Sequence, residues 1–285
     1  MTKVAFFDRR LLATFYKYAT AVSVFLSFVF PFVDIPKDCL PAPSYGLWYK
    51  AAAFVAAFLV VYIVVWVWSN RLRNVSINIE GSEVNVVAGD IFQQPGLKVI
   101  AFNEYFDTLV DERVISSRSV NGMFVKQILK TPVADLDNYI ESYQFQDDEI
   151  IGENQNRRAG KKKRYKIGTI CVYEEFLLAA FSKFDEDNKA VLTMPEYLEF
   201  LINFWDRVNS IYGQRSVSTT IFGSGITRIK GHKLISDEDL LKIMLWTFRI
   251  SEMRFKYPAK LTIVIHEEKI NKINLFDIQT VKNGV

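Results

Sequence analysis

Two short segments of this 285-residue chain carry side chains suited to holding a nucleotide. Residues 88–91 (AGDI) follow an apolar run typical of a strand, and a carboxylate at a strand end can accept hydrogen bonds from the exocyclic amine of a base. Residues 116–122 (SSRSVNG) precede a predicted helix over 123–130, where hydroxyls and free backbone N–H groups suit an anion. Each segment has an ordinary alternative, because Gly-Asp is common in turns and serines cap helices.

A third candidate segment, residues 222–228 (FGSGITR), follows a predicted strand. Its two glycines allow backbone N–H groups to converge on a phosphate, and Thr227 and Arg228 add a hydroxyl and a fixed positive charge. The segment is not a P-loop, because no Gly-Lys-Ser/Thr follows, and it lacks the third glycine of the dinucleotide fingerprint. It therefore favours phosphate binding without specifying the nucleotide.

Other chemistry finds little support in the sequence. Residues 185–196 (DEDNKAVLTMPE) match a calcium loop only superficially, because Ala190 stands where that loop needs glycine. The two histidines are far apart, and we identify no metal-ligand spacing and no hydrolase triad. The net charge of +3 is too small to indicate nucleic acid as a partner. We expect no catalytic residue, no metal and no cofactor.

The elements that position these segments lie from residue 74 onward. Capping residues predict the starts of two helices, at Thr193 and Ser236. Residues 75–80 and 83–89 alternate around Gly81-Ser82 and predict a hairpin or two edge strands. Further strands are predicted over 97–103, 167–173, 176–184, 217–225 and 261–266. Strands that alternate with helices indicate an α/β domain over 74–285, with helices on the faces of its sheet.

Residues 1–73 have a different character and predict a transmembrane hairpin. The runs 11–33 and 47–68 would each form a helix of roughly 33 Å, close to the ~30 Å hydrocarbon core. A cleaved signal peptide and buried helices of a soluble protein are the alternatives. The first run continues to Val33 without a small-residue cleavage site, and residues 51–68 carry no charge, which disfavours both.

The charges that flank the two runs predict their direction. Arg9 and Arg10 precede the first run, and Arg71 and Arg73 follow the second. The positive-inside rule then places both termini, and the domain that follows, in the cytoplasm. The polar segment 147–166 ends in a basic stretch, and we expect it to be solvated and disordered, with binding to anionic lipid head groups as the alternative.

Four segments together resemble a known family: residues 86–92 (VVAGDIF), 103–109 (NEYFDTL), 114–119 (VISSRS) and 223–228 (GSGITR). Their order resembles a macro domain, and more closely the macro-like domain of Thoeris antiphage effectors. The two preceding apolar runs are similar to those of the membrane-bound effectors of type II Thoeris systems. The resemblance covers nearly the whole chain and implies a two-helix transmembrane hairpin followed by a macro-like mixed-sheet α/β domain.

The resemblance also implies a ligand and roles for individual residues. Macro domains bind ADP-ribose derivatives at their strand ends, and the signal implied here is histidine-ADP-ribose made by a TIR-domain partner. Asp90 would bind the adenine amine, Ile91 would add backbone contacts, and Asn103 would face the distal ribose or its conjugate. The residues implied around the diphosphate are Ser119, Asn121, Gly122, Gly223, Ser224, Gly225, Ile226, Thr227 and Arg228.

Three functions remain open at this level. The first is an effector of the bacterial inner membrane that binds the signal, forms a homo-oligomer and disrupts the membrane. The second is a membrane-anchored ADP-ribosyl hydrolase that uses Asn103 or Asp107 to activate water. The third is a structural anchor whose basic segment 157–166 engages lipid or nucleic acid. The sequence NEYFD at 103–107, with a Ser-rich stretch after it, departs from hydrolytic macro domains and favours sensing.

Overall fold

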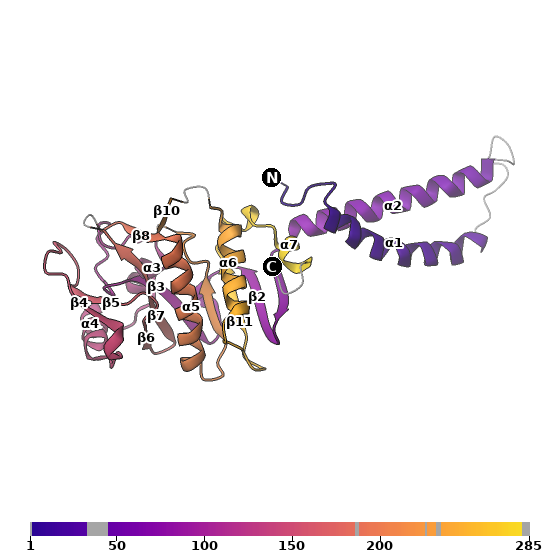
Figure 1. The fold of residues 1–285 in the computed structure, drawn as a ribbon. Coiled ribbons are helices and arrows are strands. Elements are labelled where there is room, and N and C mark those ends of the chain that lie inside the picture. The colour runs from indigo at the N-terminus through magenta and orange to yellow at the C-terminus, as the bar shows by residue number, and fades with distance from the viewer. Residues whose placement is uncertain (1, 33–44, 186–187, 226, 232–234, 281–285) are drawn as a thin grey trace. The chain divides into compact units, whose positions relative to one another are not determined.

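The computed structural model describes residues 2–32, 45–185, 188–225, 227–231 and 235–280. These residues form two compact units, drawn in Figure 1. One unit comprises Met1–Arg73 together with Asn274–Thr280, and the other is built on Asn74–Ile273.

The first unit is built on two long helices, α1 (Arg9–Val29) and α2 (Tyr45–Arg71), with the short 3-10 helix η1 (Phe30–Phe32) after α1. The two long helices overlap the apolar runs predicted over 11–33 and 47–68, although α1 ends at Val29 and α2 continues to Arg71. Both are long and apolar enough to cross a membrane. They pack through aromatic side chains, because the Phe15 and Tyr62 rings lie 5.3 Å apart. The predicted connection over residues 34–46 falls largely on 33–44, which lie outside the described residues.

The C-terminal helix α7 (Leu275–Thr280) belongs to this first unit. The Phe276 side chain is 2% exposed and packs in a hydrophobic cluster with Leu11, Tyr62 and Val65. Arg10 of α1 also forms an ion pair with Asp277. A domain boundary placed after residue 73 assigns this helix to the α/β domain, whereas its contacts place it with the helix pair.

The second unit contains one large mixed sheet with strand order β1-β2-β11-β9-β3-β7-β8-β10, and β6 pairs with β7. The predicted hairpin is formed by β1 and β2, which pair antiparallel. The neighbours β2, β11, β9, β3 and β7 run parallel to one another, so their carboxyl ends meet at one edge. The strand bounds are β1 Asn74–Ile79, β2 Ser82–Ala88, β3 Leu97–Asn103, β6 Ile170–Tyr173, β7 Phe176–Phe184, β8 Ala190–Thr193, β9 Val217–Thr220, β10 Arg228–Lys230 and β11 Leu261–Ile265.

Both faces of this sheet are covered. Side chains alternate along a strand, so on β7 Phe181 packs against Phe200 of α5 while Ala180 contributes to the cluster on the other face. The helices α5 (Met194–Ile211) and α6 (Asp237–Ile250) begin at the predicted caps and lie side by side (Figure 1). The other face carries α3 (Val120–Met123), the π-helix η4 (Phe124–Ile128) and α4 (Val133–Ser142).

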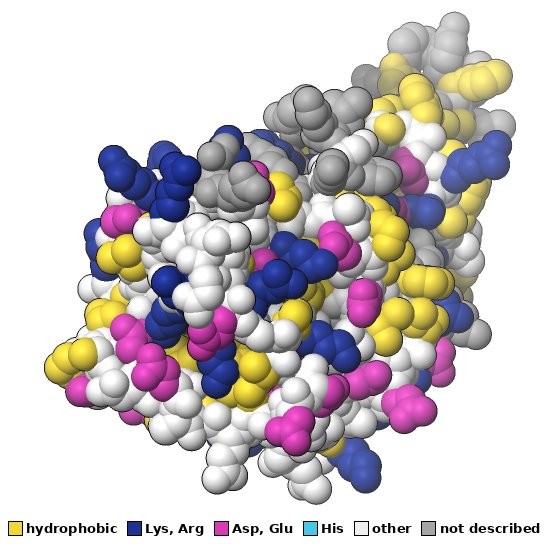
Figure 2. All heavy atoms as spheres, turned by 60° about the vertical axis from the view of Figure 1, so that its left-hand side comes forward, with side chains coloured by type: hydrophobic (Ala, Val, Ile, Leu, Met, Phe, Trp, Pro, Cys, Tyr) yellow, Lys and Arg dark blue, Asp and Glu magenta, His cyan; other side chains and the backbone are white. Residues whose placement is uncertain are grey.

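The polar segment 147–166 is ordered, so the expectation of a disordered excursion was wrong. After the 3-10 helix η5 (Asp147–Glu149), it forms an antiparallel ribbon of β4 (Ile150–Glu153) and β5 (Lys163–Tyr165). Tyr165 is buried in the hydrophobic cluster with Phe106. Figure 2 shows that Lys and Arg side chains on this end of the domain are interspersed with Asp and Glu.

Candidate functional site

The sheet brings the three candidate segments to one edge. Ala88 at the end of β2 pairs with Ile265, and Thr220 at the end of β9 pairs with Val264. Asn103 at the end of β3 pairs with Ser182 of β7. Along this edge the order is therefore the turn at 89–91, the end of β11, the loop at 221–227, and then the ends of β3 and β7.

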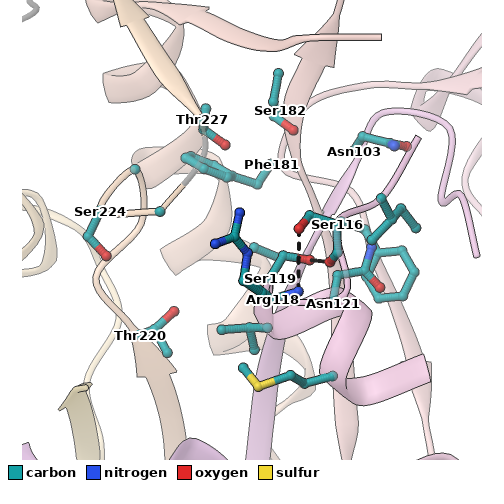
Figure 3. A pocket seen from close by; sticks show the side chains of 18 of the residues that line it. Asn103, Ser116, Arg118, Ser119, Asn121, Phe181, Ser182, Thr220, Ser224 and Thr227 are labelled. Carbon is teal, nitrogen blue, oxygen red and sulfur yellow. Dashed lines mark hydrogen bonds between the residues drawn. The ribbon is translucent and has the colours of Figure 1, made fainter. Parts of the chain in front are cut away.

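A cavity of about 980 Å³ opens at this edge, within the ~300–1,000 Å³ usual for ligand sites. Figure 3 shows side chains from the loops after β3 and β9, and from β7 itself, that face it. Of the residues predicted for the site, seven line the cavity: Asn103, Ser119, Asn121, Gly223, Ser224, Gly225 and Thr227. The loops at 116–122 and 223–227 therefore share one cavity.

The Ser-rich loop at 116–122 is held mainly by its own hydrogen bonds. The carboxylate of Glu112 accepts from the Ser117 N–H at 2.9 Å and from the Ser116 hydroxyl at 3.0 Å. Hydrogen bonding from the Ser117 side chain, together with these two bonds, lowers the pKa of Glu112 to about 2. The Ser119 hydroxyl donates to the Ser116 carbonyl and accepts from the Gly122 N–H at 2.9 Å. A Cβ on Gly122 would collide with the Ser116 carbonyl. Ser119 is thus a helix cap, and Gly122 allows the tight packing of the loop.

Two side chains of this loop remain available to a ligand. Asn121 is 6% exposed, and its Oδ1 has no hydrogen-bond partner among the described residues. Arg118 is exposed on the cavity wall, and no hydrogen bond or ion pair of its guanidinium occurs within the described part of the chain. Figure 3 shows Arg118 between the two loops. Arg118 was not among the residues predicted for the site, although it stands inside the SSRS motif.

The loop at 221–227 presents backbone donors. Gly223 adopts φ +81°, which a side chain would strain, and an added Cβ on Gly225 would meet open space. Within the described residues, the N–H groups of Gly223 and Gly225 donate to no other group. Lys269, which also lines the cavity, holds the loop in place, because its ammonium contacts the Ser224 carbonyl. Ile226 and the side chain of Arg228 lie outside the described residues.

The Asn103 carboxamide lines the cavity, but most of its bonds shape its own turn. Its Oδ1 accepts from the N–H groups of Tyr105 and Asp107 at 3.0 and 3.3 Å, and its Nδ2 donates to Asp107 at 2.9 Å. One N–H of the two on Nδ2 is left for a ligand. Asn103 can therefore offer a ligand one donor, whereas its Oδ1 already accepts two hydrogen bonds.

The predicted adenine residues lie at the same edge but do not line the cavity. The exposed carboxylate of Asp90 accepts from the Phe92 N–H at 2.9 Å and caps the 3-10 helix η3 (Ile91–Gln93). Ile91 is buried beneath this turn. The local role of Asp90 is thus the ordinary turn chemistry that the sequence left open, and its contact with a base stays a prediction.

Several lining residues were missed by the sequence analysis. Ser182 and Thr220 stand near the carboxyl ends of β7 and β9, which run parallel in the structure, whereas the predicted strand over 217–225 extended past Thr220. Phe181 adds an aromatic ring beside them. Asn188 and His266 carry no local sequence signal, and only the fold brings them to this edge.

Comparison with known proteins identifies the family. Residues 84–266 match the model described as "Thoeris protein ThsA, Macro domain". A "Thoeris protein ThsA" from Bacillus amyloliquefaciens (strain Y2) is 35% identical over 286 residues, covering 98% of this chain and 91% of that protein. The chain belongs to the Thoeris ThsA family. Two solved variants of an Oceanobacillus iheyensis macrodomain also resemble it, at 13% and 12% identity over 70% of this chain and 88% and 95% of theirs.

Those two macrodomain variants have TM-scores of 0.37. The ThsA macro-domain match covers the sheet from β2 to β11 and therefore includes nearly all of the cavity wall. The architecture agrees with the expected order, a helix pair followed by a macro-like mixed α/β sheet. This ThsA-family chain is a macro-domain protein of the antiphage Thoeris system.

Proposed function

We propose that this protein is a membrane effector that binds an ADP-ribose-type signal in the cavity of its macro domain. One observation carries the proposal: the loops at 116–122 and 223–227 line a single cavity at the carboxyl edge of the parallel strands. Ligands of open α/β sheets bind outside the carboxyl ends of the strands. Binding would then change the state of the attached helix pair.

The groups around the cavity suit a nucleotide diphosphate. The uncommitted N–H groups of Gly223 and Gly225 can cradle a phosphate, and the Arg118 guanidinium can neutralise its charge. The buried Oδ1 of Asn121 is an acceptor that a ribose hydroxyl could satisfy. These groups favour a ligand that is anionic in its middle and rich in hydroxyls.

The signal we propose is histidine-ADP-ribose, made by a TIR-domain partner as in type II Thoeris systems. The volume of about 980 Å³ lies near the upper end of ligand cavities, which leaves space for a group beyond the diphosphate. No further cofactor enters this proposal, because the signal itself is the ligand.

We place the helix pair in the bacterial inner membrane, with both termini and the macro domain in the cytoplasm. The supporting observations are the two apolar helices and the arginines before α1 and after α2. A lone pair of helices cannot enclose an aqueous path, so membrane disruption requires a homo-oligomer. The signal must bind the assembled state more tightly than the resting state. Small residues that allow close helix packing are Ala51, Ala52, Ala53, Ala56 and Ala57.

We propose binding without turnover. The alternative, an ADP-ribosyl hydrolase, needs a free carboxylate or amide to activate water. Asp107 is fully buried and already accepts from Arg157, the Lys161 N–H and Asn103, and Asn103 is engaged in its own turn. These contacts favour sensing over hydrolysis.

Calorimetry of the full chain in detergent micelles with ADP-ribose tests the proposal. Gly225→Glu places a negative charge in the open space next to the loop at 221–227, where the phosphates would bind. It should weaken binding by about 100-fold, because a carboxylate in contact with a phosphate costs several kcal/mol. Asn209→Glu makes the same charge change at an exposed position near the far end of α5 and should bind like the wild type. Absence of binding by the wild type, or equal binding by Gly225→Glu, would refute it, and release of free product from the signal would favour the hydrolase.

A further inference from the structure

A buried ion pair joins the β4–β5 connection to the turn after β3. The Arg157 and Asp107 side chains are 5% and 0% exposed, and the guanidinium meets both carboxylate oxygens, at 2.6 and 3.0 Å. The Lys161 N–H donates to the same carboxylate at 2.7 Å. A buried carboxylate of this kind is tolerated only when its charge is paired and its lone pairs are satisfied.

Arg157 makes a second set of contacts on its other side. Its Nε and Nη2 donate to the Asn188 Oδ1 at 3.2 and 2.9 Å. Its guanidinium also lies over the Tyr105 ring, 3.8 Å from the centroid. The surroundings leave no spare space, because a Cβ on Gly160 would press against both Arg157 and Asp107. The guanidinium is therefore held in one position by groups from three separate segments.

These contacts lead to the cavity, although Arg157 itself is not among the residues that line it. On one side, Asp107 accepts from the carboxamide of Asn103, which lines the cavity at the end of β3. On the other side, Asn188 lines the cavity in the turn after β7. Arg157 thus connects two parts of the wall at the β3/β7 end of the site.

We propose that Arg157 is a positioning residue that fixes the β3/β7 end of the cavity and so sets affinity for the ligand group lying there. The inference rests on the proposed function. The loop at 221–227, after β9, lies in the middle of the edge. A nucleotide whose phosphates are held there has one end toward β2 and β11 and the other toward β3 and β7. The group governed by Arg157 is the one attached beyond the diphosphate, which ADP-ribose has and ADP lacks.

The test is calorimetry of the full-length chain in micelles with two probes, ADP-ribose and ADP. Arg157→Lys keeps the charge but cannot bridge both carboxylate oxygens and Asn188 at once. We expect it to weaken ADP-ribose binding by about tenfold and to change ADP binding by less than about twofold. Arg158→Lys is the matched control, since the neighbouring Arg158 is exposed, and should leave both affinities unchanged.

A second variant guards against a simple loss of folding. Gly160→Ala pushes a methyl group against the ion pair without touching the cavity, and should cause the same selective loss of ADP-ribose affinity as Arg157→Lys. Affinities are compared for each variant that retains a cooperative thermal transition. Equal losses for ADP and ADP-ribose, or no loss for either, would overturn the assignment of Arg157. A wild-type chain that binds neither probe would instead refute the proposed function on which the inference stands.

Discussion

The buried Oδ1 of Asn121, which has no hydrogen-bond partner among the described residues, should lower the stability of the ligand-free chain. A buried acceptor without a donor costs about 1–3 kcal/mol of stability. Asn121→Leu replaces the carboxamide by an apolar group of similar size and should raise the stability of the ligand-free chain by about 1 kcal/mol. For a domain of about 200 residues this corresponds to a rise in Tm of roughly 2–4 °C. The same change should weaken ADP-ribose binding by about tenfold.

Two measurements on one preparation decide this prediction. Thermal unfolding of the full chain in micelles, followed by tryptophan fluorescence, gives the change in Tm without ligand, and calorimetry with ADP-ribose gives the affinity. Asn209→Leu on the exposed face of α5 is the control, because it relieves no buried acceptor and should not raise the Tm. A lower Tm together with unchanged affinity would show that Asn121 serves the fold alone, and the reasoning from its free oxygen would be refuted.

Two further predictions concern titratable groups. Burial raises the pKa of Glu196, but hydrogen bonds from Lys183 and Thr193 outweigh this effect and bring the pKa to about 2. This carboxylate therefore contributes stability above pH ~4.5, and the contribution is lost as the pH falls toward 2. Glu196→Gln should therefore reduce the fall in Tm over that range, and an unchanged pH profile would contradict the assignment. Burial raises the pKa of the Cys171 thiol to about 12, so in a Cys39→Ala chain native protein at pH 8 should resist maleimide and react only after unfolding. Rapid labelling of the native chain would count against it.

Local chemistry explains why much of the fold was predictable from the sequence. The helices α5 and α6 begin at the predicted caps because Thr193 and Ser236 each form a capping box with an acidic residue three positions later. The hairpin of β1 and β2 follows from alternation, which is strict between buried and exposed residues in β1 and continues with less exposed residues in β2. The predicted helix over 123–130 was less accurate, because the helical segment begins at Val120 and becomes π-helical at Phe124.

Features that depend on distant partners were not predictable from the sequence. The segment 147–166 has a polar composition typical of disorder, yet Arg157 is paired with a carboxylate 50 positions earlier in the chain. Asp90 follows a strand as a base-binding carboxylate would, yet its side chain is used to cap the next turn. Asn188 reaches the cavity only because β7 lies beside β3. Single-sequence reasoning identifies such groups but not the partners that the fold gives them.

The assignment of α7 to the helix pair has a consequence for how motion can pass between the two units. The backbone crosses from one unit to the other after Arg73 and crosses back after Ile273. A unit joined by one flexible backbone connection can rotate freely about it, whereas a unit joined by two can rotate only about the line between them. Because two backbone connections join the units, a rearrangement of the unit built on Asn74–Ile273 acts on the helix pair through both connections at once.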